Sequence, residues 1–311
     1  SRFDINRRLH HLDDLLAVLG GRPQTNAAAT DTETTVAAPG RLLPDATLNI
    51  PRIRAMDADV KYSAASIRAP NFPLRGAMVR VKLDNGLLVA DPLRFDLPQG
   101  NIAGVARLDA RKNVPVSAID LRLSRARLEQ LIPTGSGGAT PLTGGLVGRV
   151  KLSGPGASVR EAAANADGEA MLVVPGGEVR EAFAELLGVN VVKGLGLLLS
   201  KDQSKTDVRC AVAHFQARDG VLRSDRIIFD TEPVLGVGEG TIDLRTERMS
   251  LRIAGKPKEA RLIRLMAPVT VNGPIVQPKI GVEPGKAIAQ GGVAAALGAL
   301  VTPIAAILPF I

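Results

Sequence analysis

The stretch Val81–Arg111, VKLDNGLLVADPLRFDLPQGNIAGVARLDAR, decides how this chain of 311 residues folds. Within it Leu93, Phe95 and Leu97 alternate with polar residues, which is the two-residue period of a half-buried strand. The pair Asn85-Gly86 separates two such segments, and this pair favours a tight β-hairpin because both residues tolerate positive φ. The stretch therefore predicts antiparallel strands with one apolar face and one polar face.

The same pattern returns without a gap in residues 215–245, FQARDGVLRSDRIIFDTEPVLGVGEGTIDLR, at an offset of 134 residues. Identical residues stand at Gly86/Gly220, Leu88/Leu222, Asp91/Asp225, Phe95/Phe229, Asp96/Asp230, Gly104/Gly238, Asp109/Asp243 and Arg111/Arg245. We interpret 81–111 and 215–245 as an internal repeat of a β-meander. The shared Asn-Gly and Asp-Gly pairs are explained by turn geometry rather than by catalysis.

The rest of the chain divides into regions of different composition. We expect an amphipathic helix over 1–21, stopped by Gly20-Gly21, and a flexible linker over 22–41. Residues 42–311 then form one β domain, in which Ser158 and Glu161 fit the start of a short helix. An apolar helix is expected over 285–311, and its last 21 residues carry no charge. We favour its docking on apolar sheet surface over insertion in a membrane, because Pro303 and Pro309 interrupt it.

The charge of the chain allows several partners. The formal net charge is +8, but the basic residues are spread singly and aromatic residues make up only 3%. Few side chains are therefore available to stack on bases, and no nucleic-acid partner is expected. Attraction to anionic lipid headgroups fits the charge at least as well, and solubility alone is the plainer explanation.

No catalytic constellation assembles in the sequence. The nucleophile-elbow, phosphate-loop and zinc-protease motifs are all missing, and three histidines cannot easily supply metal sites. His214 is expected to share the face of Val208, Cys210 and Val212, with Cys210 as a small apolar filler. The aspartates Asp84, Asp91, Asp219 and Asp225 all stand beside expected turns, where they form local hydrogen bonds. We therefore expect no enzyme, no metal and no cofactor.

Many strands with one apolar face, and few long helices to cover them, indicate a face that is buried by another layer or by a ligand. Aliphatic side chains suit an acyl chain, because they stabilise any buried apolar surface at ~25 cal/mol per Å². The alternation predicts a set of residues that line such a face: Val79, Val81, Leu83, Leu121, Leu123, Ile242, Leu244, Leu251 and Ile253. For any one of them an ordinary core position is an equally good explanation.

Three segments carry a resemblance to a known family. VRCAVAHFQARDGVLRSDRIIFDT, then GVGEGTIDLRTERMSLRI, then KPKEARLIRLMAPVTVNGPIVQPKIGV resemble, in this order, the C-terminal region of the AsmA-like family of Gram-negative envelope proteins. The upstream SGPGASVREAAANADGEAMLVV is also similar to a family segment, and the likeness runs from about residue 48 to 311. The resemblance implies a periplasmic protein that an N-terminal helix anchors to the inner membrane in the full-length form. It also implies kinship with bridge-like lipid transfer proteins, whose stacked β units form an open apolar groove.

From the residues and the resemblance together we expect a mainly β fold: a curved, largely antiparallel sheet that forms an elongated hydrophobic groove, with a few short flanking helices. The expected function is binding of phospholipid or another acyl lipid and its transfer between the inner and outer membranes. The alternatives are a structural or assembly role in outer-membrane biogenesis without lipid passage, and a β-solenoid adhesin with a dry core. The chain opens without Met, so we expect a fragment or a processed product that lacks the anchor.

Overall fold

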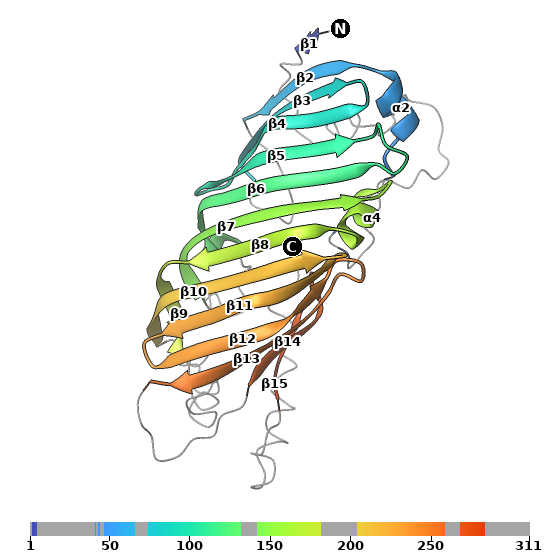
Figure 1. Ribbon diagram of the computed structural model, residues 1–311. Coiled ribbons are helices and arrows are strands. Elements are labelled where there is room, and N and C mark those ends of the chain that lie inside the picture. The colour runs from blue at the N-terminus through green and yellow to red at the C-terminus, as the bar shows by residue number, and fades with distance from the viewer. Residues whose placement is uncertain are drawn as a thin grey trace, which may run out of the picture.

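The computed structural model describes residues 2–4, 41, 43, 47–65, 74–131, 142–181, 204–258 and 268–283. Within these residues the chain forms one large sheet and three short helices, α2 (Ile50–Ala55), α3 (Leu128–Leu131) and α4 (Val159–Ala164) (Figure 1). The strands are β1 (Arg2–Asp4), β2 (Ala58–Ala64), β3 (Gly76–Asp84), β4 (Leu87–Asp96), β5 (Asn101–Asp109), β6 (Val116–Arg127), β7 (Leu142–Pro155), β8 (Asp167–Val174), β9 (Gly177–Arg180), β10 (Lys205–Arg218), β11 (Val221–Thr231), β12 (Val234–Asp243), β13 (Arg248–Pro257), β14 (Val269–Pro274) and β15 (Lys279–Val282).

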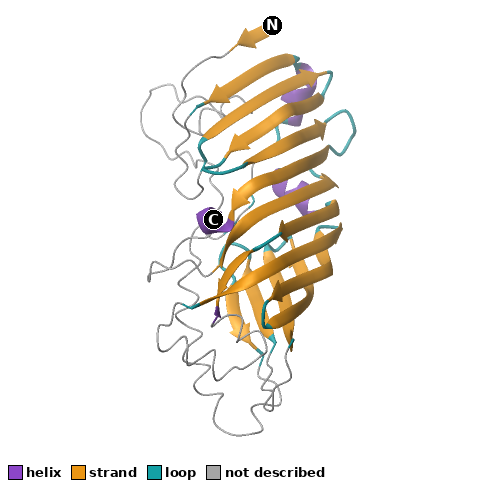
Figure 2. Ribbon diagram, turned by 90° about the vertical axis from the view of Figure 1, so that its left-hand side faces the viewer, coloured by secondary structure: helices purple, strands orange, loops and turns teal. Residues whose placement is uncertain are grey.

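The strands lie in the sheet almost in the order in which the chain makes them. The path runs from β1 to β8 and on from β10 to β15, while β9 pairs with both β7 and β10 beside it. Every pairing is antiparallel except that of β1 with β2. Seen from the side, the described part of the chain is a single twisted layer (Figure 2). The predicted fold class, a mainly antiparallel β protein with a few short helices, is confirmed.

The two repeated segments have the same strand register. Val81 lies opposite Ala90 and Val79 opposite Leu93, with a β-bulge between the two pairs. At an offset of 134 residues, Phe215 lies opposite Ser224 and Ala213 opposite Ile227, with a shift at the same place. The next pairing repeats as well, because Leu93 faces Gly104 and Ile227 faces Gly238. We call β3–β5 the first unit and β10–β12 the second unit.

Each unit also has a short helix at its hairpin end: α4, which confirms the helix predicted after Ser158, and α2, which the sequence did not indicate. The side chain of Asn49 caps α2 by accepting from the N–H of Arg52, and the hydroxyl of Ser158 caps α4 by accepting from that of Glu161. After each helix an aspartate accepts a hydrogen bond from the hairpin turn. Asp57 Oδ1 lies 2.9 Å from the backbone nitrogen of Asn85, and Asp167 Oδ1 lies 3.0 Å from that of Asp219. The structural repeat is therefore longer than the sequence repeat.

Two expectations about local structure are wrong, both because a bulge inserts a residue. Asp91 and Asp225 do not lie beside turns but within β4 and β11, at the bulges described above. Val208 does not share a face with Cys210, since the ladder shifts between them. Val208 is buried next to Val179 and Phe229, while Cys210 is half-buried on the opposite face.

Several expectations fall on residues outside the described ranges. Of the helix expected over 1–21 only Arg2–Asp4 is described, and these residues form a strand instead, parallel to β2. Most of the linker over 22–41 and the whole region beyond Glu283, which includes the apolar helix expected over 285–311, lie outside the described residues.

Candidate functional site

One face of the sheet is apolar from β3 to β14. A row of directly opposed residues crosses it, each strand contributing the next member: Val79, Leu93, Gly104, Leu121, Val150, Ala170 and Phe215. A second row continues through Ala213, Ile227, Gly238, Ile253 and Val269. Alternation along each strand brings the remaining aliphatic residues to the same side. We call this surface the apolar face.

The structure places all nine sequence-predicted lining residues on the apolar face. Val79 and Leu83 are buried, with 5% and 7% of their surface exposed, and the other seven are half-buried. They come from β3, β6, β12 and β13 and the turn after β12, so they form separate groups along the sheet. The sequence reasoning missed the residues that join these groups, among them Leu93, Ile102, Val150, Leu152, Leu172 and Phe215. The signal was present, since each follows the same alternation.

The apolar face is packed differently along its length. Over β10–β13 it is filled by its own side chains, and Phe215 and Ile227 are only 6% and 8% exposed. Glycines on β12 allow this, because a Cβ on Gly238 would lie 2.7 Å from the Cγ2 of Ile227. Near the middle of the sheet, Leu172 lies over Gly148 on the neighbouring strand and is 46% exposed. The middle therefore offers apolar side chains that the described residues do not bury.

The described part of the chain supplies no second layer over the apolar face. Each strand packs mainly against its neighbours in the sheet, and the helices contact β4, β6 and β7. In the side view α2 and α4 lie at one end of the strands (Figures 1 and 2). The eleven neighbouring strands β3–β8 and β10–β14, at a spacing of about 4.8 Å, make the face roughly 50 Å long.

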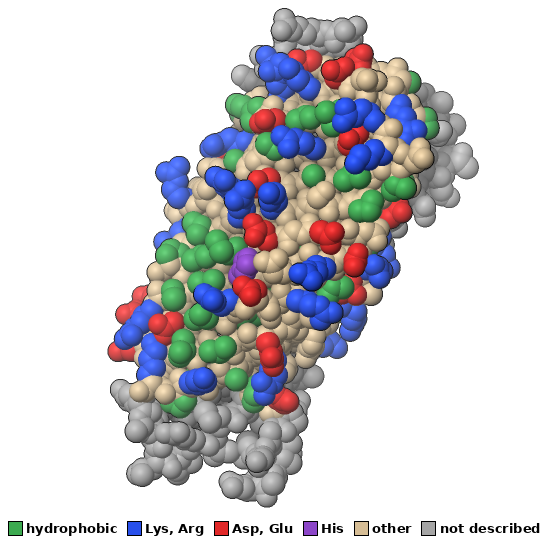
Figure 3. Space-filling view, viewed as in Figure 1, with side chains coloured by type: hydrophobic (Ala, Val, Ile, Leu, Met, Phe, Trp, Pro, Cys, Tyr) green, Lys and Arg blue, Asp and Glu red, His purple; other side chains and the backbone are tan. Residues whose placement is uncertain are grey.

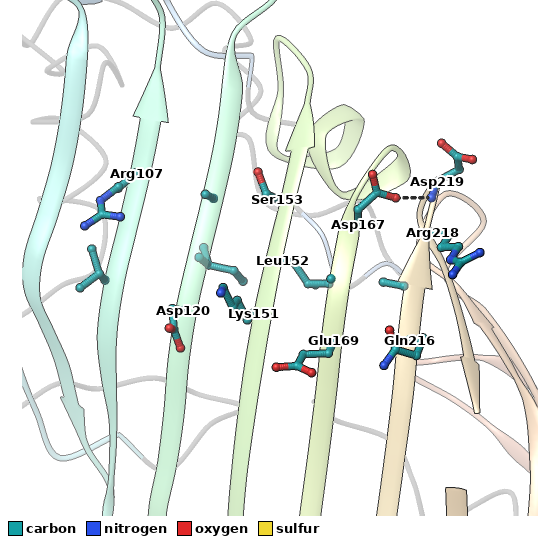
Figure 4. Close-up of a pocket in the computed structure, with 15 residues that line it drawn as sticks. Arg107, Asp120, Lys151, Leu152, Ser153, Asp167, Glu169, Gln216, Arg218 and Asp219 are labelled. Carbon is teal, nitrogen blue, oxygen red and sulfur yellow. Dashed lines mark hydrogen bonds between the residues drawn. The ribbon is translucent and has the colours of Figure 1, made fainter. Parts of the chain in front are cut away.

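The opposite face is polar and carries a hollow of about 780 Å³ that spans β5 to β10 (Figure 4). Its floor shows charges of alternating sign, with Asp120, Lys151 and Glu169 directly opposite one another on neighbouring strands. Arg149 binds Asp120 through two hydrogen bonds of 3.0 and 2.7 Å, and this bond keeps the pKa of the Asp120 carboxyl below its usual value. Cross-strand pairs of this kind stabilise a sheet, and their charges cancel. The hollow is thus a neutralised polar surface.

His214 lies on this polar face between two carboxylates. Its Nδ1 is 3.0 Å from Asp225 Oδ2 and its Nε2 is 3.8 Å from Glu169 Oε2. Among the described residues no group of three or more His, Cys, Asp or Glu side chains is placed to hold a metal ion. His10 and His11 lie outside the described residues.

Comparison with known proteins gives a consistent result. The model of the AsmA family matches residues 8–227. The chain is 31% identical, over 309 residues, to the AsmA family protein YhjG of Escherichia coli strain K12. That alignment covers 98% of this chain and 45% of the relative, so the chain spans less than half of the relative's length. No solved structure matches the chain.

Within the described residues, none of the helices has the length and apolar character needed to cross a membrane.

Proposed function

The chain belongs to the AsmA family, and from this premise we propose that it binds acyl lipids on its apolar face and passes them along that face between the inner and outer membranes. One observation carries the proposal: a single sheet layer presents one apolar face across eleven neighbouring strands, β3–β8 and β10–β14. A surface of that length stabilises an acyl chain at many successive positions. Movement between positions then requires no new type of contact.

The proposed mechanism is passive. Each methylene that leaves water for the apolar face contributes about 0.8 kcal/mol, whichever aliphatic side chain receives it. Headgroups stay at the edge of the sheet, where the exposed ends of the strands meet water. No reaction is required, so the proposed role is not enzymatic, and no cofactor is needed. We further propose a periplasmic location, with inner-membrane anchoring in the full-length protein, on the basis of the family alone.

A structural role in outer-membrane biogenesis is the second candidate, and one observation favours it. Over β10–β13 the apolar face is already filled by Phe215, Ile227 and their neighbours. If the whole face were covered in that way, the sheet would serve as a scaffold. The half-buried Leu121 and the exposed Leu172 distinguish the middle of the sheet from that packed end.

The experiment is native mass spectrometry of the purified chain, followed by organic extraction and lipid identification. We expect co-purified phospholipid, and we expect Leu121→Asp and Ile242→Asp to remove it, because a charge opposes an acyl chain at either site. Arg122→Asp is the matched control, since the neighbouring residue Arg122 is exposed on the polar face of the same strand. Circular dichroism shows whether each variant is folded.

A folded chain that carries no lipid and takes up no added phospholipid would contradict the proposal. Unfolding of both aspartate variants, with no folded fraction that has lost lipid, would favour the scaffold. Because Leu121 lies in the half-buried middle and Ile242 in the cluster around Phe215, the two variants also test the two parts of the face separately.

A further inference from the structure

The polar face carries a row of aliphatic residues that the apolar face does not explain. Val147, Val173, Val212, Ile228 and Val237 lie directly opposite one another on β7, β8, β10, β11 and β12. Val147 and Val237 are exposed, at 39% and 44%, and so is the adjacent Met171 at 42%. Figure 3 shows apolar side chains gathered over this lower half of the molecule, among scattered charges. We call these five residues the aliphatic ladder.

The repeat shows that the fold does not require the aliphatic ladder. In the first unit the positions equivalent to Val212, Ile228 and Val237 are Met78, Arg94 and Ala103. Their backbone pairing is the same, since Met78 lies opposite Arg94 and Arg94 opposite Ala103. Arg94 forms an exposed ion pair of 2.8 Å with Asp96. The same strand geometry therefore accepts an arginine at one of the three positions, and the unbroken aliphatic row in the second unit needs another reason.

Two exposed cations beside the aliphatic ladder, Arg226 and Lys256, have no ion pair within the described residues. The carboxylates near the ladder have partners of their own: Asp225 contacts His214, Asp230 contacts Lys258, and Glu239 lies 3.8 Å from Arg252, which also binds Glu283 at 2.7 Å. Arg226 and Lys256 are exposed beside the ladder, opposite His214 and Leu235 respectively. Neither has an ion pair or hydrogen bond within the described residues. The border of the ladder thus carries unpaired positive charge.

We propose that the aliphatic ladder is a contact surface for an anionic lipid bilayer. The valine and isoleucine side chains enter the boundary between headgroups and acyl chains, and Arg226 and Lys256 lie over lipid phosphates. The inference goes beyond the proposed function, because it concerns the opposite face of the sheet. There the protein contacts a membrane surface and does not enclose a single lipid.

The shape of the aliphatic ladder favours a membrane over a protein partner. Four strand spacings of about 4.8 Å make it roughly 19 Å long, and it is one or two side chains wide. A stable interface between two proteins buries about 800 Å² on each, which such a strip does not provide. A bilayer needs no matching shape, and a weak contact is enough where a chain has other attachments to the membrane.

The test measures sedimentation of the whole chain with vesicles. One vesicle population contains equal parts of phosphatidylglycerol and phosphatidylcholine, and the other contains phosphatidylcholine alone. We expect binding to the anionic vesicles only. Val212→Ser should weaken it about tenfold, because an aliphatic contact is lost. The equivalent variant Met78→Ser, at a 50% exposed site of the first unit, is the matched control and should bind like the unchanged chain.

The charge contribution is tested separately. Arg226→Gln and Lys256→Gln should each weaken binding about fivefold at low salt, in line with about 1 kcal/mol per cation near an anionic surface. The difference should vanish in 1 M salt, where charges are screened beyond about 3 Å. Equal binding to both vesicle types, or equal losses in Val212→Ser and Met78→Ser, would overturn the proposal.

The two proposals fail in distinguishable ways. Lipid bound to the apolar face is measured by native mass spectrometry, and Val212→Ser should retain it. Loss of vesicle binding with retained lipid supports the aliphatic ladder as a membrane contact. A chain that self-associates in analytical ultracentrifugation, and becomes monomeric on Val212→Ser, would instead assign the ladder to a second copy and overturn the membrane proposal.

Discussion

The turn of the first unit and the turn of the second unit have nearly the same backbone. Asn85 and Asp219 have φ values of 45° and 49°, and the glycines that follow them have values of 76° and 74°. A backbone N–H of each turn donates to an aspartate that follows a short helix, Asp57 in the first unit and Asp167 in the second. The turns differ in the atoms that pack against their glycines. Gly86 faces the side chains of Arg54 and Arg111, whereas Gly220 lies against the backbone of α4.

This difference separates two requirements. A two-residue hairpin needs positive φ because of the twist of its strands, and both units meet that need with the same residue types. What packs behind the turn is not set by the turn. It depends on the neighbouring helix. The polar face also differs between the units although the strand pairing is the same, since Arg94 in the first unit corresponds to Ile228 in the second. Equivalent substitutions in the two units should therefore have unequal effects.

The largest difference is expected for Gly220→Ala against Gly86→Ala. Both place an alanine at positive φ, which costs about 1–2 kcal/mol. A Cβ at residue 220 would also lie 2.3 Å from the carbonyl oxygen of Ala164, so that α4 must shift. At residue 86 the nearest atom is the Cγ of Arg111, at 3.3 Å, which belongs to a flexible side chain. Urea unfolding should show a loss of about 2–5 kcal/mol for Gly220→Ala and about 1–2 kcal/mol for Gly86→Ala. Equal losses in the free energy of unfolding would show that the packing of α4 against Gly220 does not affect the cost of the substitution.

A second difference is expected after the last strand of each unit. Glu247 is 4% exposed and lies 3.1 Å from Arg160 of α4, and it also accepts from the backbone of Leu43 at 3.3 Å. Its equivalent in the first unit is Asn113, which is exposed. Glu247→Ala leaves Arg160 as a buried charge without this partner, and we expect the free energy of unfolding to fall by about 3–5 kcal/mol.

Asn113→Ala is the control for Glu247→Ala, and a change within about 0.5 kcal/mol is expected there. Both variants are compared by urea unfolding at neutral pH. A loss below about 1 kcal/mol in Glu247→Ala would mean that water replaces the carboxylate and that the pair does not hold α4 against the β12–β13 turn.

Alternation and turn residues were enough to predict the antiparallel sheet and the face on which Val79, Leu121 and Ile253 lie. Both signals are local, so a single sequence contains them. The bulges at Asp91 and Asp225 could not be predicted, because an extra residue in one strand becomes visible only when the partner strand is known. Val208 was expected on the wrong face for the same reason, because a bulge lies between it and Cys210.

The pairing partners on the polar face depend on contacts between distant segments and were also missed. Val147 and Val237 join one row only because β7 and β12 belong to the same sheet. The capping helix α2 was missed for a different reason: six residues with a proline are too short to show a helical period. Sequence therefore predicts which face a residue prefers, and the fold determines which residues meet there.

The smallest expected difference concerns the carboxylate that closes each unit. Asp109 accepts hydrogen bonds from the guanidinium of Arg111, at 2.9 Å, and from its backbone N–H, at 3.1 Å. These bonds lower the pKa of Asp109 to about 2. In the second unit Asp243 accepts from the backbone of Arg245, whose guanidinium binds the carbonyl oxygen of Ala164 instead. Arg111→Ala should therefore raise the pKa of Asp109 toward its usual value, whereas Arg245→Ala removes no bond between a guanidinium and a carboxylate.

Carbon-13 NMR of the Asp109 carboxyl measures this titration directly. Since folding lowers the pKa, the contribution of Asp109 to stability is fully present above the pKa of the unfolded chain and is lost as the pH falls toward 2. The difference in urea midpoint between the unchanged chain and Asp109→Asn should be constant near neutral pH and disappear in strong acid. If Arg111→Ala left the titration of Asp109 near 2, the backbone N–H alone would account for the shift. The closing turns of the two units would then be electrostatically alike, since Asp243 keeps that same bond.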